Sequence, residues 1–315
     1  MFVRDRVGRW VKLRELNVLM TVAEEGGMGK AARVLNTSQS AISRSIRDLE
    51  NAIGAKLLDR GAEGIELTDF GRVLIESATA AFDELRQGIK RVEALAGSTH
   101  GEVRVAGNEP QLLAIIPGVI ARMQRMYPGI SVQVSPQDVL SQQMEGLRER
   151  TIDVILARLP PVVDDDVAVE RLFHDPAYII AAANNPWGRR RKIDLADLTD
   201  EHWCLPPAGS LPSNMFAAAL RAGGLTFPPK RYSTGSPAMH AAVLSNGPFL
   251  AILPNSFLKL AGRLPPFKIL PIKLAASFAP VGLMILKRRS LSPPVLKFAE
   301  CVREVVKPLS RLMAA

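Results

Sequence analysis

The fold of the N-terminal part of the chain is decided by residues 26–54, GGMGKAARVLNTSQSAISRSIRDLENAIG. Two short helices are predicted here, over about 28–35 and about 39–53, because apolar residues recur at three- and four-residue spacing between glycines. The polar turn 36–38 joins them, and the Ser38 hydroxyl suits the N-cap of the second helix. Such a helix–turn–helix can place its second helix in the major groove of DNA.

The first turns of that second helix carry side chains that suit base edges and phosphates. They are Ser38, Gln39, Ser40, Ser43, Arg44 and Arg47. Glutamine can pair with adenine, arginine with guanine, and serine with bases or phosphates. The segment 37–47 contains two arginines and no acidic residue. An ordinary solvated helix face would have the same composition, so these residues alone leave DNA binding and a bland surface both open.

A wider set of segments carries a family resemblance. The chain closely resembles the DNA-binding domain of LysR-type transcriptional regulators. The resemblance lies in the order and spacing of residues 13–16 (LREL), 23–50, 57–60 (LLDR) and 67–71 (LTDFG). The resemblance implies that the recognition helix reads DNA through Gln39, Ser43 and Arg44. It further implies that Arg60 and the hairpin 61–64 form a wing.

Two residues depart from the family pattern. Ser40 stands where many members have proline, a residue that fits the first turn of a helix. Glu63 stands at the wing tip, where a basic residue is common. Because an acidic side chain is repelled by phosphates, Glu63 puts wing contact in question.

A long helix is predicted after Thr68. Its apolar positions repeat about every 3.5 residues over 73–96, the pattern of a coiled-coil seam. A helix packed only on its own domain remains an alternative, whereas the resemblance favours a dimerisation helix. A two-fold homodimer would read a pseudo-palindromic site on double-stranded DNA. In this family two such dimers commonly assemble as a homotetramer.

After Gly101 the pattern changes to alternating strands and helices, the α/β pattern of a parallel sheet. With the resemblance, the predicted fold class is α/β with an N-terminal all-α winged helix–turn–helix and a long linker helix. A C-terminal effector domain of the type 2 periplasmic-binding-protein fold, with two α/β subdomains, follows. The expected ranges are 1–68 (DNA-binding domain), 69–97 (linker/dimerisation helix), 101–177 with 274–309 (effector subdomain I) and 178–273 (effector subdomain II).

The resemblance also implies a small-molecule effector in the cleft between the two subdomains. Loops at strand ends and helix N-termini, which attract anions, would hold it. The effector-binding candidates are Asn108, Glu109, Gln111, Gln137, Asp138, Arg158, Ser210 and Thr234. Helix caps and turns would explain the same polar residues. Arg158 could attract the polar or anionic effector that the family suggests and Glu109 would oppose it, unless these two pair with each other.

Composition excludes several other classes. The net charge is +9, from 40 basic and 31 acidic residues, but residues 1–100 hold 15 basic and 14 acidic residues. The surplus of positive charge therefore does not by itself indicate that the N-terminal part binds nucleic acid. No stretch approaches the roughly 18 apolar residues of a membrane span, and no signal peptide is visible. We therefore expect a cytoplasmic protein without a membrane partner.

Enzyme chemistry is not indicated. Cys204 and Cys301 are the only cysteines, and the four histidines are scattered without metal-ligand spacing. No nucleophile elbow occurs. We therefore expect no catalytic residue, no metal site and no cofactor.

The favoured function is a sequence-specific transcriptional regulator whose promoter binding and DNA bending respond to an effector, through a shift between conformations. RNA polymerase would be a partner if the protein activates. The alternative is an α/β solute-binding or enzymatic protein with an accessory helical head. It is disfavoured because neither an export signal nor a convergent catalytic group is apparent.

Overall fold

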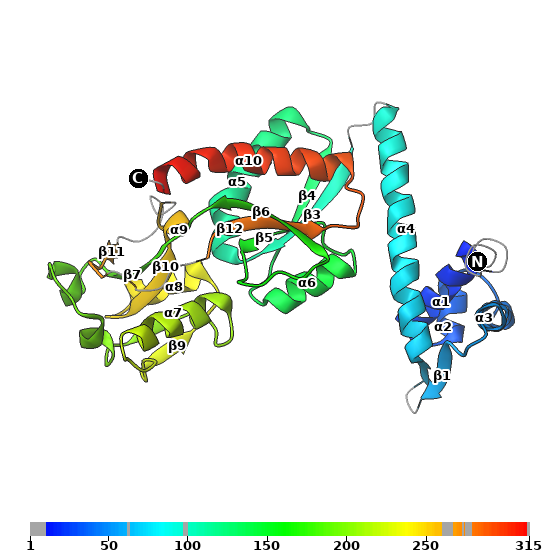
Figure 1. Cartoon of the computed structure of the whole chain (residues 1–315), viewed down its shortest axis with the longest axis horizontal. Helices are drawn as coiled ribbons and strands as arrows, with labels where there is room; N and C mark the ends of the chain where they lie inside the picture. The colour runs from blue at the N-terminus through cyan, green and yellow to red at the C-terminus, as the bar shows by residue number, and fades with distance from the viewer. Residues whose placement is uncertain are drawn as a thin grey trace. The chain divides into compact units, whose positions relative to one another are not determined.

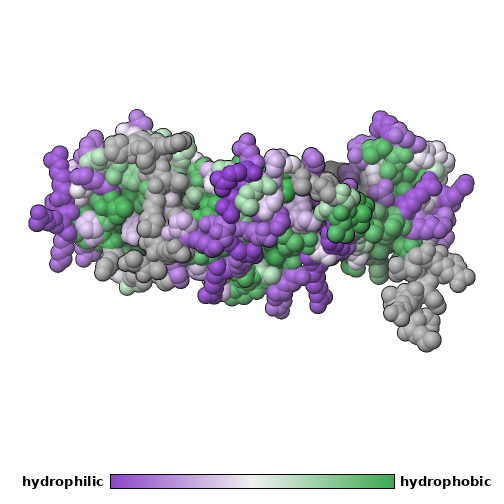
Figure 2. Space-filling view, turned by 90° about the horizontal axis from the view of Figure 1, so that it is seen from above, coloured by the Kyte–Doolittle hydropathy of each residue, from purple (hydrophilic) through white to green (hydrophobic). Residues whose placement is uncertain are grey.

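Figure 1 shows a computed structural model of the chain. The structure describes residues 11–61, 64–96, 100–259, 267–272, 274 and 279–313. The chain divides into two compact units, Met1–Gln87 and Gly88–Ala315. Among the described residues, no helix combines the length and the apolar character needed to cross a bilayer. The face drawn in Figure 2 mixes hydrophilic and hydrophobic residues, as water-exposed protein surfaces ordinarily do.

The first unit is a helical bundle with a short hairpin. Its helices are α1 (Leu13–Glu25), α2 (Met28–Val34) and α3 (Gln39–Ile53), and its antiparallel strands are β1 (Leu58–Gly61) and β2 (Gly64–Leu67). The long helix α4 (Asp69–Leu95) follows. Helices α1 and α3 end at Gly26 and Gly54, whose φ angles of 66° and 82° favour glycine. The core of this unit is built from Leu19, Val22, Ile42, Ile46, Leu49 and Leu57.

The second unit contains two five-stranded sheets. The first has the order β4-β3-β5-β12-β6, from β3 (Gly101–Gly107), β4 (Ile130–Pro136), β5 (Val154–Arg158), β6 (Val167–Phe173) and β12 (Val281–Leu286). Strand β3 runs parallel to β4 and β5, whereas β12 is antiparallel to β5 and β6. The parallel sheet expected from the sequence is therefore a mixed sheet. It packs with α5 (Glu109–Met126), α6 (Leu140–Arg148) and α10 (Pro293–Met313).

The second sheet has the order β11-β7-β10-β8-β9. Its strands are β7 (Ala177–Ala182), β8 (Trp203–Leu205), β9 (Arg231–Ser233), β10 (Leu250–Pro254) and β11 (Phe267–Ile269). The helices of this part are η1 (Pro186–Arg189), η2 (Leu195–Leu198), α7 (Leu211–Ala222), α8 (Pro237–Ser245) and α9 (Asn255–Lys259). Its core includes Trp203 and Phe216, whose ring centroids lie 5.3 Å apart. Since β6 and β7 are consecutive in the chain, residues 174–176 carry the chain from one sheet to the other.

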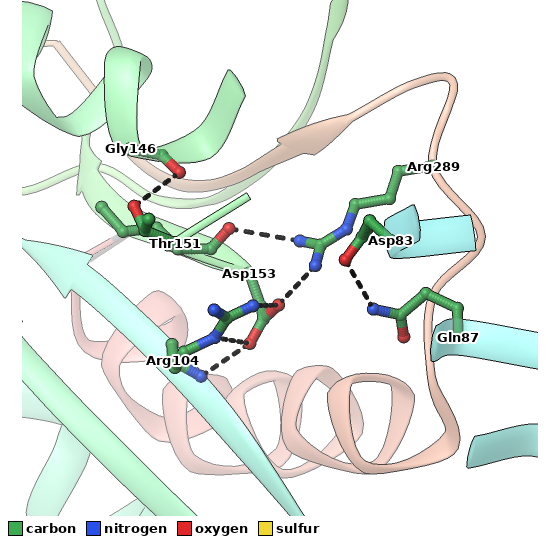
Figure 3. A network of polar contacts seen from close by, with 8 residues as sticks. Asp83, Gln87, Arg104, Gly146, Thr151, Asp153 and Arg289 are labelled. Atoms are coloured by element: carbon green, nitrogen blue, oxygen red, sulfur yellow. Dashed lines mark hydrogen bonds and ion pairs between the residues drawn. The ribbon is translucent and has the colours of Figure 1, made fainter. Parts of the chain in front are cut away.

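A buried ion-pair network fixes the start of β5 in the first sheet (Figure 3). The Asp153 carboxylate lies 2.8 Å from Nη2 of Arg104 and 2.8 Å from Nη2 of Arg289, and it accepts the backbone N–H of Arg104 at 2.8 Å. Although burial favours the protonated acid, these arginines outweigh it and lower the pKa of Asp153. Arg289 also donates to the carbonyl of Ile152. The network therefore ties β3, β5 and the turn after β12 together.

Candidate DNA-reading helix and effector cleft

Helix α3 presents a polar face opposite its buried apolar face. Ile42, Ile46 and Leu49 are buried, whereas the exposed side chains near its N-terminus are Ser38, Gln39, Ser40, Arg44 and Arg47, and Ser43 is partly exposed. The Ser38 hydroxyl accepts the backbone N–H of Ala41 at 3.2 Å and lies 2.9 Å from the Ser40 hydroxyl. The predicted DNA contacts at the start of α3 thus share one accessible, basic surface that the core does not use.

The C-terminal end of α3 is fixed to the hairpin by Glu50, which the sequence analysis did not identify. Its carboxylate accepts from Nζ of Lys56 at 2.8 Å and from the backbone N–H of Leu57 at 2.9 Å. Burial opposes ionisation, but these hydrogen bonds outweigh it and lower the pKa of Glu50. The hairpin is therefore held at a defined position relative to α3.

The hairpin pairs Arg60 with Ile65 across β1 and β2. Arg60 thus lies in the strand that leads to the predicted wing tip. Glu63, which departs from the family pattern, lies outside the described residues. Thr68 closes the hairpin: its hydroxyl donates to the carbonyl of Lys56 at 2.7 Å and accepts the N–H of Gly71 at 3.0 Å, which caps α4.

A cleft lies between the two sheets of the second unit, with about 600 Å³ of empty space when the part open to solvent is counted. Six of the eight effector-binding candidates line it, namely Asn108, Gln111, Asp138, Arg158, Ser210 and Thr234. Glu109 and Gln137 are not among the lining residues. The backbone carbonyl of Gln137 accepts hydrogen bonds from the side-chain amides of Asn108 and Gln143. The lining also includes Gly235, from the loop that holds the candidate Thr234, and His240, which the sequence analysis missed.

Two of the lining residues also have the cap and turn roles that were open from the sequence. The Ser210 hydroxyl lies at the N-terminus of α7, accepts the N–H of Ser213 at 3.4 Å and donates to the carbonyl of Pro207 at 2.6 Å. The Thr234 hydroxyl accepts the N–H of Ser236 at 3.1 Å, a turn just before α8. A cap or turn hydrogen bond and a place in the cleft lining are therefore compatible here.

Arg158, at the end of β5, is held inside the protein by Asp175 in the segment between β6 and β7. Its Nη2 lies 3.3 Å from Oδ2 of Asp175, and its Nη1 donates to the carbonyl of Ala279 at 2.9 Å. Asp175 is fully buried and also accepts from Gln111, from the Ser256 N–H at 2.8 Å and from the Ser256 hydroxyl at 2.7 Å. Burial lowers the pKa of Arg158, and the Asp175 carboxylate works against that shift.

Asp138 and His240 are the other ionisable groups of the lining. Asp138 is half-buried and lies against the backbone of Gly235, where a Cβ would come within 1.8 Å of Oδ2 of Asp138. Burial raises the pKa of Asp138, against a hydrogen bond from Asn108. Burial likewise lowers the pKa of His240 to about 4, although the carbonyls of Ser236 and Cys204 favour the protonated ring. The His240 ring is therefore neutral near pH 7.

The two units define a class of protein in which a helix–turn–helix DNA-binding unit is carried with a two-sheet ligand-binding domain. Two family models match the chain. "Bacterial regulatory helix-turn-helix protein, lysR family" matches residues 13–72, and "LysR substrate binding domain" matches residues 96–307. The chain belongs to the LysR family of transcriptional regulators. It is a DNA-binding regulator with an effector-binding domain and not an enzyme, which decides against the solute-binding or enzymatic alternative.

Curated relatives and solved structures agree with this membership. The HTH-type transcriptional regulator TfdT of Cupriavidus pinatubonensis is 31% identical, over 64% of this chain and 88% of its own length. GbpR of Azospirillum brasilense is 27% identical, over 90% of this chain and 83% of its own. Full-length CbnR complexed with its target DNA has a TM-score of 0.63 at 25% identity, covering 94% of this chain and 100% of that one. OxyR of Pseudomonas aeruginosa shares the fold, with a TM-score of 0.68, 22% identity, and 94% and 95% coverage.

Proposed function

We propose that this regulator reads a pseudo-palindromic site on double-stranded DNA through the exposed face of α3. The observation that carries the proposal is that the polar residues there lie opposite the buried stripe of the same helix. Gln39 and Arg44 would contact base edges, Ser43 would contact bases or phosphates, and Ser38, Ser40, Arg47 and Arg60 would contact mainly the phosphate backbone. The predicted DNA-contacting residues are thus divided by role.

A homodimer is proposed to form through α4. The side chains of Leu85, Ile89, Val92 and Leu95 are 48%, 59%, 66% and 89% exposed, at spacings of four, three and three residues along the helix. An exposed apolar row of this length on one helix is typical of a coiled-coil seam. Two such dimers would form the homotetramer that is common in the family. In each chain we propose the domains expected from the sequence: 1–68, 69–97, 101–177 with 274–309, and 178–273.

An effector in the cleft is proposed to bias the regulator between conformations. The cleft is lined from both sheets, so a ligand that contacts both sides favours one relative position of the two over others. The change would alter how the DNA-reading helices of an oligomer are spaced, and with it DNA bending and, for an activator, contact with RNA polymerase. We place this activity in the cytoplasm.

The decisive experiment is a footprint and mobility-shift titration on the DNA upstream of the protein's own gene. Gln39→Ala and Arg44→Ala should each weaken specific binding by about 10- to 100-fold, since one good base contact is worth about 1–3 kcal/mol. Binding should also weaken steeply with salt, because phosphate contacts release counterions.

The matched control is Arg125→Ala, which removes one exposed positive charge from α5 in the other unit. It should leave specific DNA binding within about twofold. Equal losses for Arg44→Ala and Arg125→Ala would contradict base reading by α3. Absence of specific retardation by the wild type at low and moderate salt would contradict recognition of this upstream site.

A further inference from the structure

The charges that line the cleft do not suit an anion. Arg158 is the cation among the described residues that line the cleft, and it is 4% exposed and held by Asp175 and the carbonyl of Ala279. An anion that took Arg158 would have to draw it from a carboxylate that is itself fully buried. Removing one partner of a buried ion pair is costly, because the other charge stays behind in a medium of low dielectric. Arg158 is therefore already neutralised by Asp175 and is not available to bind an anionic ligand.

Asp138 remains as a carboxylate that faces the cleft without a cation. The side chain of Asn108 is the group that hydrogen-bonds it, and within the described ranges no lysine or arginine forms an ion pair with it. Its Oδ2 lies directly against Gly235, on the opposite wall. A carboxylate placed there, half-removed from water, favours a partner that supplies hydrogen-bond donors or positive charge.

His240 adds no positive charge to the same cleft. The residue is 2% exposed, and Nδ1 lies 3.1 Å from the carbonyl oxygen of Ser236. The backbone carbonyl of Cys204 also faces the ring, and burial lowers the pKa of His240 to about 4. The ring is therefore neutral near pH 7 and does not compensate the Asp138 carboxylate.

The rest of the described lining is largely apolar. Five prolines line the cleft, at Pro110, Pro206, Pro207, Pro212 and Pro254, and Ile252 and Leu253 add aliphatic surface from β10. Apolar walls with a small number of polar groups favour a ligand with an apolar body and one polar end.

We infer that the cleft takes a small ligand with an apolar body whose ammonium, amidinium or amide N–H group faces Asp138, and that it disfavours anions. The inference rests on the proposed role of this cleft as the effector site. The sequence resemblance suggested a polar or anionic effector; this inference keeps the polar class, as a cationic or neutral hydrogen-bond donor, and disfavours the anionic one.

The test uses three probes of nearly the same shape: benzamidine (a cation), benzamide (a neutral donor) and benzoate (an anion). Their binding to the full-length protein is measured by calorimetry and by the shift in melting temperature. Benzamidine and benzamide should bind more tightly than benzoate. Asp138→Asn should weaken benzamidine by about 10- to 100-fold, the range for a lost hydrogen bond to a charged group, and should change benzamide much less. Asp165→Asn, at an exposed position outside the lining, is the matched control and should change none of the three.

Three results would overturn the inference. One is benzoate binding as tightly as benzamidine, and another is benzamidine binding that survives Asp138→Asn. The third is failure of all three probes to bind at concentrations up to about 20 mM. The footprint is recorded on the same preparations. A specific footprint with any of these results leaves the regulator in place and removes only the ligand class, whereas probe binding without a footprint counts against DNA reading alone.

Discussion

Substitution of Asp175 by asparagine should destabilise the effector domain through one interaction in particular. The Asp175 carboxylate accepts four donors: the N–H and hydroxyl of Ser256, the Gln111 amide and the Arg158 guanidinium. Asparagine keeps one oxygen, which can still accept the Ser256 N–H. The Ser256 hydroxyl can turn to accept from the new NH₂ group, and the Gln111 amide can present its oxygen. The guanidinium cannot accept in any orientation, so the loss concentrates at Arg158.

The size of the loss follows from burial and distance. Arg158 and Asp175 side chains are 4% and 0% exposed, so solvent does not screen them. Breaking such a pair by removing one partner costs about 3–5 kcal/mol. The 3.3 Å separation is longer than in the strongest charge-assisted hydrogen bonds, which places the expected cost near about 3 kcal/mol. Against a typical domain stability of about 5–15 kcal/mol, that loss is large.

Urea denaturation gives the measurement, followed by tryptophan fluorescence, to which the buried Trp203 of the second sheet contributes. Asp166→Asn is the matched control, because its carboxylate pairs with Arg148 at an exposed site and should cost at most about 1 kcal/mol. Adding Arg158→Met to Asp175→Asn should recover much of the stability, since no buried charge is then left over. A loss for Asp175→Asn that equals the loss for Asp166→Asn would refute the reasoning.

Three further outcomes are expected. Gly235→Ala should force Asp138 away from the opposite wall and raise amide hydrogen exchange in the loop before α8, with α3 unchanged; equal exchange in both proteins would contradict the close contact. Val92→Glu, at a position 66% exposed in the single chain, should shift the sedimentation equilibrium toward monomer by more than tenfold without unfolding it, whereas an unchanged dimer would place the interface elsewhere. Burial lowers the pKa of His240 from 6.5 to about 4, so the unfolded chain binds a proton that the folded chain does not, and stability is lost as the pH falls through this window. His240→Gln should therefore remove up to about 1.4 kcal/mol per pH unit of this slope, while the exposed control His174→Gln should keep it.

The recognition helix could be predicted closely because its signals are local. The predicted range, about 39–53, equals the range of α3 in the structure. Gly54 ends the helix and Ser38 caps it, and both act within one turn of the boundary. The mixed character of the first sheet could not be found in this way. It depends on β12, which enters beside β5 after more than a hundred intervening residues.

The cleft shows the same limit at the level of single side chains. Loops at strand ends were predicted to face the ligand, and six of the eight named residues do line the cleft. Whether a polar residue on such a loop lines the cleft depends on packing: Gln137 is not among the lining residues, and its backbone carbonyl accepts from the side chains of Asn108 and Gln143. His240 had no local signal beyond the Ser–Pro start of its helix, α8.

Arg158 shows why the difference between its environment in the structure and the one expected from the sequence matters for function. From the sequence it is a cation at the end of a strand beside a cleft, which suggests an anchor for an anion. In the structure its carboxylate partner, Asp175, sits where the chain crosses from one sheet to the other, and Ser256 holds that carboxylate from α9. An anion that drew Arg158 away would therefore weaken the joint between the two sheets as it bound. Asp138 lies against Gly235 on the opposite wall. A donor ligand at Asp138 would leave the joint at Asp175 intact, so under the proposed role of the cleft it would favour one relative position of the two sheets at lower cost.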